Sequence, residues 1–457
     1  MISIKPSMIE SENFYSKMLI EPTTTIKKRL AIAFAVAVII VFSAILAFGK
    51  RDGKLPPVVE VKSQEAKNAA PVLAKSEVAG LIEKNAFSPN EQVVPIADEN
   101  GNVLYVRTTV LPSLQARATR WVKASRAAQT ALVIINPDTG EVLALAGYRN
   151  DGEDYGTALA GSFPAASLFK IVTAAAAVEA ADLSADSALA YDGGKHTLYK
   201  NHLKKEADQG SNASTLKESF AESINSVFGK LGAFTLGPAE LADFAGRFGF
   251  NHELGFEIPV ESSTFSVGDE KDAFHLAELA SGFNRQTRVS PLHGALMAAV
   301  AATGGKLPEP FIVKEVFDIE NNIYYQAASS EATEAVSPAT ALELERLMRS
   351  TVEEGTARKT FAGAKNHPVL SKLVIGGKSG SINNEDGQRV DWFVAWAKPG
   401  QDLNGAPSLA LSAVVVYDDL ATTTSQRLIK DSILAYYQDY IKRQGSKNGG
   451  TRSARAN

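Results

Sequence analysis

The chain has 457 residues, and its 47 basic and 51 acidic residues give a formal net charge of −4. This balance argues against nucleic acid as a partner, because phosphate recognition depends on a clustered basic surface. The sequence has no cysteine and its six histidines form no H-E-x-x-H pair, which excludes disulfides and thiol catalysis and gives no expectation of a metal site.

A run of 19 residues without a charge extends from Leu30 to Phe48. A bilayer core of about 30 Å requires about 20 apolar residues of helix, so this run predicts one transmembrane helix. Three basic residues precede it, which favours a cytoplasmic location for the tail of residues 1–29. A cleaved signal peptide ending near Gly49 is the alternative. The run is longer than the usual apolar region of about 7–15 residues, so we expect an uncleaved membrane anchor.

Residues 49–100 are predicted to form a stalk or linker, because Pro56-Pro57 favours extended backbone and charged stretches follow. Within this segment, residues 76–87 have the amphipathic pattern of a short helix. The hydrophobic periodicity strengthens from residue 101, and we expect one folded domain over residues 101–441. The basic, Gly-rich residues 442–457 predict a disordered tail.

The domain is predicted to begin with a helix over residues 115–128 and a β-hairpin. Residues 130–135 are apolar and β-branched, Asn136-Pro137-Asp138-Thr139-Gly140 is a strong turn signal, and residues 141–146 resume the strand pattern. These features predict two antiparallel strands at the start of the domain.

The middle of the domain is predicted to be helical and its end to contain strands and a final helix. We expect helices over 164–181, 215–231 and 291–303, strands over 373–379, 392–397 and 409–417, and a last helix over 424–443. Strands at both ends with helices between them indicate an α+β fold, in which one antiparallel sheet is flanked by helices. Its first and last strands are expected to meet, and the intervening helices to form an inserted lobe.

The first chemical motif is Ser167-Leu168-Phe169-Lys170. Pro164 suits the first turn of a helix and Ser162 could cap it, so Ser167 and Lys170 are expected on one helical face. A serine hydroxyl becomes nucleophilic when a base removes its proton. A lysine can be that base if burial or a neighbouring cation lowers its pKa, and the apolar run that follows Lys170 offers burial.

The same pattern occurs a second time, at Ser214-Thr215-Leu216-Lys217. Here Thr215 and Glu218 have the spacing of a capping box, so this match is expected to mark the start of a helix. The motif alone does not distinguish Ser167 from Ser214.

Two further motifs follow along the chain, Ser223-Ile224-Asn225 and Lys378-Ser379-Gly380-Ser381. Gly377-Lys378-Ser379 also imitates the end of a phosphate loop. Such a loop requires a glycine where the chain has Lys372, and no helix opens after Ser381, so we reject that interpretation.

The order S-x-x-K, S-x-N and K-S-G resembles the motif set of class A β-lactamases and penicillin-binding proteins. Ser167 precedes Ser223 by 56 residues and Ser223 precedes Lys378 by 155, spacings similar to those of the transpeptidase domain of high-molecular-mass penicillin-binding proteins. Ser214 lies only nine residues before Ser223 and fits poorly. The hairpin sequence over 131–144 also resembles this family, and the similarity extends over residues 101–441.

The resemblance implies a β-lactamase/transpeptidase-like fold and a penicillin-binding peptidoglycan D,D-transpeptidase that works through an acyl-serine intermediate. It implies that Ser167 is the nucleophile, Lys170 the base and Ser223 the proton relay. It also implies that Asn225 binds the substrate and Lys170, and that Lys378 provides a positive charge. Ser379, Gly380 and Ser381 would bind substrate, with an oxyanion hole from the N–H groups of Ser167 and Ser381. No metal or cofactor is implied.

The implied partners are peptidoglycan stem peptides and β-lactams, at the outer face of a bacterial cytoplasmic membrane. Ser379 stands where threonine is commoner, and Ala395 where glycine is usual. Only about 50 residues separate the predicted anchor from the domain, which leaves the subfamily open and suggests a separate glycosyltransferase. A D,D-carboxypeptidase, a β-lactamase and a non-catalytic penicillin-binding scaffold or sensor remain alternatives.

Overall fold

The computed structural model describes residues 73–453, apart from 86, 150–151, 207–210, 269–271, 329–331 and 404. The predicted cytoplasmic tail of residues 1–29 and the predicted membrane helix of residues 30–48 lie outside these residues. Within the described part of the chain, no helix combines the length and the apolarity that crossing a bilayer requires.

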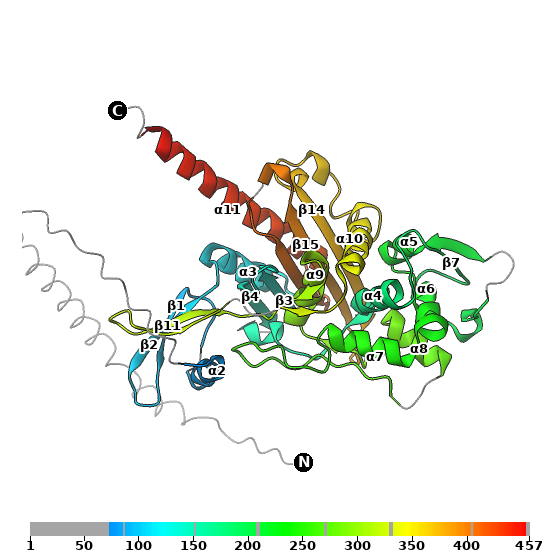
Figure 1. The fold of residues 1–457 in the computed structure, drawn as a ribbon, viewed down its shortest axis with the longest axis horizontal. Coiled ribbons are helices and arrows are strands. Elements are labelled where there is room, and N and C mark those ends of the chain that lie inside the picture. The colour runs from blue at the N-terminus through cyan, green and yellow to red at the C-terminus, as the bar shows by residue number, and fades with distance from the viewer. Residues whose placement is uncertain are drawn as a thin grey trace, which may run out of the picture. The chain divides into compact units, whose positions relative to one another are not determined.

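A six-stranded antiparallel sheet forms the centre of the fold, in the order β14-β15-β16-β3-β4-β5 (Figure 1). Its strands are β3 (Gln129–Ile135), β4 (Val142–Arg149), β5 (Gly152–Glu153), β14 (Leu373–Asn383), β15 (Arg389–Pro399) and β16 (Leu409–Val416). The pairing of β16 with β3, in the register Leu411 opposite Ile134, confirms that the first and last strands of the domain meet.

Both faces of this sheet are covered, which explains why β3 and β16 are mostly apolar and almost completely buried rather than alternating. Val133 belongs to the core on one face, together with the helix α9 (Pro291–Ala302). Ile134 belongs to the core on the other face, together with α3 (Pro112–Ala124) and α11 (Ser425–Ser453).

Between β5 and β14 the chain forms the predicted helical lobe. Besides α9, the helices of this lobe are α4 (Lys170–Ala180), α5 (Leu216–Ala221), α6 (Asn225–Lys230), α7 (Pro238–Arg247), α8 (Ala273–Ser281) and α10 (Pro338–Glu353). The α+β prediction is therefore correct, and the lobe contributes one wall of the site described below.

The helix predicted over 164–181 begins later than expected. Phe163–Pro164 form a short strand, β6, which pairs with β9 (Arg288–Val289), so Ser162 does not cap a helix. The chain turns at Ala166, whose φ is +48°, and continues as a 3₁₀ turn over Ala166–Phe169 into α4. Pro164 has a fixed φ that suits a short edge strand as well as a first helical turn, which is why the sequence misled.

The single helix predicted over 215–231 is in fact two helices. The capping box is present, since the Thr215 hydroxyl accepts from the Glu218 N–H and the Glu218 carboxylate accepts from the Thr215 N–H. However, α5 ends at Ala221 and α6 begins at Asn225, because Ser223 adopts a left-handed φ of +57°. A serine in this conformation is strained, and such strain is often found at functional sites.

Residues that were predicted as a stalk are folded from residue 73 onwards. The helix α2 (Lys75–Lys84) begins one residue before the predicted helix of residues 76–87 and ends three residues before its end, and β1 (Val93–Ala97) and β2 (Val103–Thr108) form a hairpin. This hairpin joins β11 (Val313–Phe317) and β12 (Ile323–Gln326) in a second sheet of order β1-β2-β11-β12. We call α2 and this sheet the N-terminal module. Its pairing with strands some 200 residues later has no local signal in the sequence.

The last helix is also longer than predicted. α11 continues to Ser453, whereas the sequence predicted an end at Arg443 and a disordered tail over 442–457. Gly445, Gly449 and Gly450 disfavour helix, so their composition suggested a loop.

Candidate active site

Ser167 lies in the turn that joins β6 to α4, and its side chain is partly accessible. The turn is held from three directions. The Ala165 N–H donates to the Thr287 carbonyl at 2.8 Å, and the Leu168 N–H donates to the Ala165 carbonyl at 3.1 Å. The Trp392 indole of β15 donates to the Pro164 carbonyl at 2.9 Å. The turn that carries the candidate nucleophile is therefore held by its own backbone, by the segment before β9 and by the central sheet.

Lys170 opens α4, and its side chain is completely buried. Its Nζ lies 2.8 Å from the Ser167 Oγ, 2.8 Å from the Asn225 Oδ1 and 2.6 Å from the Ser281 carbonyl oxygen. The Asn225 amide is itself oriented, because its Nδ2 donates to the His196 carbonyl at 2.8 Å, so its oxygen faces Lys170. Two of the three partners of Nζ can only accept hydrogen bonds.

Burial lowers the pKa of Lys170 well below its ordinary value, and the nearby positive charge of Lys378 lowers it further. No carboxylate contacts this amine among the described residues. A neutral lysine amine has two N–H bonds and one lone pair. Asn225 and Ser281 accept both N–H bonds, which leaves the lone pair directed at the Ser167 hydroxyl. The geometry is that of a base poised against a nucleophile.

Lys378 is the second fully buried lysine, and it lies in the middle of β14. Its Nζ donates to the Ser223 Oγ at 2.9 Å and to the Ser379 carbonyl at 2.9 Å. Burial lowers the pKa of Lys378 to about 7. Ser223 can hydrogen-bond this amine because its left-handed backbone turns its side chain out of the α5–α6 junction toward β14.

The structure therefore brings together all five residues that the sequence placed in one site: Ser167, Lys170, Ser223, Asn225 and Lys378. The rival serine lies elsewhere. Ser214 is in the short strand β8 (Asn212–Thr215), and its hydroxyl bonds Ser219 at 2.6 Å rather than a lysine.

The predicted substrate-binding residues lie on β14, which is the edge strand of the central sheet. A Cβ placed on Gly380 would be 3.4 Å from the Ser167 nitrogen and 3.3 Å from the Ala166 Cβ. Gly380 therefore lies directly against the turn that carries the nucleophile. The following Ser381 belongs to the same edge strand, and the pairing of its N–H group with that of Ser167 around one oxyanion stays a prediction.

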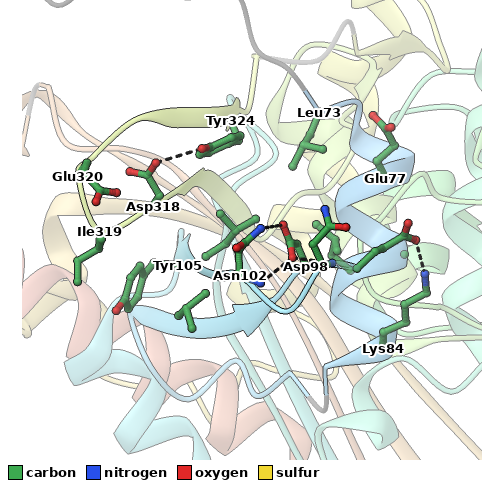
Figure 2. A pocket seen from close by; sticks show the side chains of 16 residues that line it. Leu73, Glu77, Lys84, Asp98, Asn102, Tyr105, Asp318, Ile319, Glu320 and Tyr324 are labelled. Atoms are coloured by element: carbon green, nitrogen blue, oxygen red, sulfur yellow. Dashed lines mark hydrogen bonds and ion pairs between the residues drawn. The ribbon is translucent and has the colours of Figure 1, made fainter.

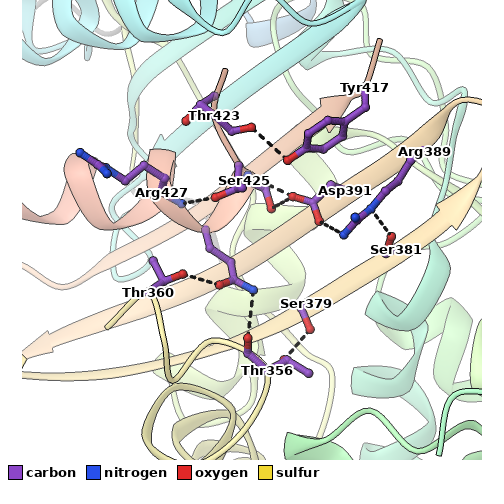
Figure 3. A network of polar contacts seen from close by, with 12 residues as sticks. Thr356, Thr360, Ser379, Ser381, Arg389, Asp391, Tyr417, Thr423, Ser425 and Arg427 are labelled. Carbon is purple, nitrogen blue, oxygen red and sulfur yellow. Dashed lines mark hydrogen bonds and ion pairs between the residues drawn. The ribbon is translucent and has the colours of Figure 1, made fainter. Parts of the chain in front are cut away.

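Two residues that the sequence did not single out hold the hydroxyls of β14 (Figure 3). The Arg389 Nε donates to the Ser381 Oγ at 3.0 Å, so the hydroxyl proton of Ser381 is free to point outward. The Thr356 and Ser379 hydroxyls bond each other at 2.6 Å. Both contacts arise from tertiary structure, since Arg389 comes from β15 and Thr356 from the segment after α10.

The network extends from these residues to the start of α11. The Asp391 carboxylate accepts from the Ser425 hydroxyl at 2.8 Å and from the Ser425 N–H at 3.2 Å. The Thr356 carbonyl accepts from the Gln426 side chain at 3.3 Å. Both sets of contacts connect the residues that hold the β14 hydroxyls to the start of α11. The first residues of α11 therefore help to fix these hydroxyls in place.

The sequence analysis also missed Ser281 and Gly282, at the end of α8. Ser281 supplies the carbonyl that accepts from Lys170, and Gly282 ends the helix with a φ of +67°. A Cβ on Gly282 would lie 1.9 Å from the Ala166 carbonyl oxygen. A glycine after an apolar helix was the only local signal, and it predicts a helix end rather than a catalytic contact.

A family model described as "Penicillin binding protein transpeptidase domain" matches residues 130–423. Among curated proteins, Stage V sporulation protein D of Bacillus subtilis is 24% identical over 272 residues, which are 57% of this chain and 41% of that protein. Peptidoglycan D,D-transpeptidase PbpA of Mycolicibacterium smegmatis is 27% identical over 267 residues, which are 56% of this chain and 50% of that protein. The matched region thus spans half or less of these relatives.

Solved structures share the fold. PBPA from Mycobacterium tuberculosis has a TM-score of 0.58 and 24% identity, and the match covers 72% of this chain and 81% of that one. The imipenem acyl-enzyme complex of penicillin-binding protein A from M. tuberculosis has a TM-score of 0.58 and 23% identity, with 73% of this chain and 79% of that chain covered.

Gly282→Ala tests the contact between α8 and the Ser167 turn. We expect a loss of about 3 kcal/mol or more in the free energy of unfolding, because the new methyl group overlaps the Ala166 carbonyl and the left-handed backbone also disfavours alanine. Gly268→Ala is the matched control. Its φ is +66°, but the nearest atom to its Cβ is 3.9 Å away, so about 1 kcal/mol is expected. Equal losses in the two variants, measured by chemical denaturation, would contradict the close packing.

Lys378→Met tests the cost of the buried cation. The pKa of Lys378 is lowered to about 7 in the folded protein, so the unfolded chain binds more protons between pH 7 and the ordinary lysine pKa. Folding is therefore penalised near and below pH 7, and the penalty fades as the pH rises. We expect the variant to be more stable than the wild type at pH 7 by a few kcal/mol. The loss of the hydrogen bond to Ser223 reduces this gain.

The stability difference should shrink as the pH is raised from 7 to about 10, which denaturation at several pH values measures directly. The exposed Lys359→Met variant serves as control and should change little at any pH. A Lys378→Met variant that is less stable than the wild type at pH 7 would show that the cation is stabilising.

Proposed function

The chain belongs to the penicillin-binding protein transpeptidase domain family, and we propose that it is a serine D,D-transpeptidase that cross-links peptidoglycan stem peptides and is acylated by penicillins at Ser167. One observation carries the proposal. A buried lysine that contacts no carboxylate among the described residues lies 2.8 Å from the hydroxyl of Ser167. The relatives named D,D-transpeptidase and the neighbour solved as an imipenem acyl-enzyme support the same chemistry.

In the first half-reaction, the lone pair of Lys170 takes the proton of Ser167, and the Oγ forms a bond to the carbonyl carbon of the penultimate D-alanine. The carbonyl oxygen becomes negatively charged and accepts hydrogen bonds from the N–H groups of Ser167 and Ser381. The C–N bond then breaks as the proton passes to the leaving D-alanine nitrogen. The hydroxyl of Ser223, which accepts a hydrogen bond from Lys378, is the proposed relay that carries the proton from Lys170 to the leaving nitrogen.

In the second half-reaction, an amine of a neighbouring stem peptide attacks the acyl-serine. Its nitrogen loses a proton to the same relay, the new amide bond forms, and the ester bond to Ser167 breaks. The oxygen of Ser167 recovers its proton from Lys170, which returns the site to its starting state. Asn225 holds Lys170 throughout and offers its amide to the substrate backbone.

The terminal carboxylate of the substrate binds over β14. Lys378 supplies positive charge, and the Ser379 and Ser381 hydroxyls donate hydrogen bonds. Arg389 supports this role because its guanidinium occupies the acceptor side of the Ser381 hydroxyl, which leaves the proton available for the substrate. Thr356 is a positioning residue for Ser379, because the two hydroxyls bond each other at 2.6 Å.

The same site could serve a D,D-carboxypeptidase, in which water replaces the acceptor amine, and only product analysis separates the two. A β-lactamase needs in addition a base that activates water on the acyl-enzyme. Among the described residues, no aspartate or glutamate contacts Ser167 or Lys170, which favours a penicillin target over a lactamase. The intact set of motifs favours an enzyme over a non-catalytic scaffold or sensor.

We place the catalytic domain outside the cytoplasmic membrane. The uncharged run of residues 30–48 would anchor it, with residues 1–29 in the cytoplasm and the module and domain beyond. A separate glycosyltransferase, which would polymerise the glycan strands that carry the stem peptides, is a further proposed partner.

Labelling with fluorescent penicillin followed by peptide mass spectrometry tests the assignment of the nucleophile. We expect one adduct, on the peptide that contains Ser167, and at least a roughly thousandfold lower acylation rate in Lys170→Ala, because the base is removed while its burial site remains apolar. Ser214→Ala, which alters the rival motif, should label like the wild type. An adduct on Ser214, or normal labelling of Lys170→Ala, would contradict the assignment.

Purified stem peptides distinguish the two possible acceptors. Incubation with a D-alanyl-D-alanine stem peptide and an amine acceptor should yield the cross-linked dimer and free D-alanine. Release of D-alanine without any dimer would identify a carboxypeptidase instead.

A further inference from the structure

A hollow of about 910 Å3 lies in the N-terminal module, away from the catalytic residues (Figure 2). One wall is formed by α2 and by Leu73, which precedes it, and the floor is formed by the β1–β2 turn and the start of β2. The opposite wall is formed by residues 318–320 of the β11–β12 turn and by Tyr324 of β12. We call this hollow the N-terminal groove. Its walls come from segments more than 200 residues apart, so it exists only because the module folds as one sheet.

The groove is strongly acidic. Its lining contains five carboxylates and a single lysine, Lys84, which gives a formal charge of −4. The whole chain has 47 basic and 51 acidic residues, so the charged residues outside the groove sum to zero. Charge of one sign concentrated in a concave surface attracts ligands of the opposite sign and speeds their association.

Two of these carboxylates are fixed in place by their turns. Asp98 accepts from the Asn102 N–H at 2.8 Å and from its side chain at 2.9 Å, and Asp318 accepts from the Asn322 N–H at 2.9 Å and from its side chain at 2.8 Å. These bonds lower the pKa of both carboxyl groups, so they stay ionised. In both turns an aspartate accepts hydrogen bonds from an asparagine four residues later. Each turn therefore places one negative charge at the groove.

The groove also exposes apolar side chains. Val103 on the floor is 56% exposed, and Ile319 on the β11–β12 turn is 73% exposed. Ile323, on the neighbouring strand β12, is 40% exposed. The exposure of large aliphatic side chains to water is unfavourable. Their presence in a concave surface is typical of a site that another molecule covers.

We propose that the N-terminal groove docks a cationic amphipathic segment of a partner protein, with lysine or arginine side chains against the carboxylates and an apolar side chain against Val103 and Ile319. A metal ion or a polyamine would satisfy the charge but leave the aliphatic side chains exposed. A purely apolar segment would leave the carboxylates buried without cations, which is costly. The proposal does not depend on the chemistry at Ser167.

Binding of a model peptide to the full-length chain tests the proposal. The probe is a fluorescein-labelled helical peptide of about 18 residues composed of leucine and lysine, long enough to span about 27 Å. Its counterpart has glutamate in place of every lysine. We expect the lysine peptide to bind, with an affinity that falls as salt is added, and the glutamate peptide not to bind. Fluorescence anisotropy measures both.

A pair of double variants locates the binding site. Ile319→Ser with Glu320→Lys removes an exposed aliphatic side chain and reverses a charge in the groove. Leu342→Ser with Glu334→Lys makes the same changes at exposed positions of α10 and of the short strand β13 (Thr333–Glu334). We expect roughly tenfold weaker binding of the lysine peptide by the groove variant and unchanged binding by the control variant. Thermal unfolding and penicillin labelling should be the same for both.

Equal affinities of the two variants, or no binding by the wild type, would overturn the proposal. Analytical ultracentrifugation provides the second criterion. If the wild type self-associates and only the groove variant is monomeric, the groove is occupied by a second copy of this chain, and a partner protein is excluded as its occupant.

Discussion

The buried amine of Lys170 is the constraint on which the rest of the site depends. Its two N–H bonds are taken by the Asn225 and Ser281 oxygens, so its lone pair faces the Ser167 hydroxyl. Burial and the charge of Lys378 both disfavour the protonated state of this amine. An ionised lysine would need a carboxylate here, and the described residues place none against it. Because no counter-ion stabilises the protonated form, the site favours the neutral form of Lys170.

Several unusual backbone conformations follow from this arrangement. Ala166 and Ser223 both have left-handed φ values, and each turn delivers one serine hydroxyl to one lysine. Gly282 allows α8 to end against the Ala166 carbonyl, so that the preceding carbonyl reaches Lys170. These conformations cost free energy, and the packed sheet and lobe on either side supply the stability that maintains them. Function and strain therefore coincide in the same three turns.

Sequence patterns predicted the parts of the structure that have local signals. The hairpin at Asn136–Gly140, the strand that carries Lys378 and the capping box at Thr215 were all predicted from short segments, and the separation of motifs distinguished Ser167 from Ser214. The breaks at Ala166 and Ser223 were missed because neither residue type favours a left-handed turn. Arg389 was missed because its role depends on a neighbouring strand, and the N-terminal sheet because its pairs are remote in sequence.

The protonation state of Lys170 is the central claim, and NMR of the full-length protein with lysine labelled by ¹³C at Cε measures it most directly. The Lys170 signal is assigned by its absence from the spectrum of Lys170→Arg, and its chemical shift is followed as the pH is varied. The account predicts that Lys170 titrates well below the ordinary lysine value of about 10.4, because burial and the charge of Lys378 disfavour its protonated form. A titration midpoint at that ordinary value would contradict it, because Lys170 would then be a cation beside Ser167 and could not remove its proton.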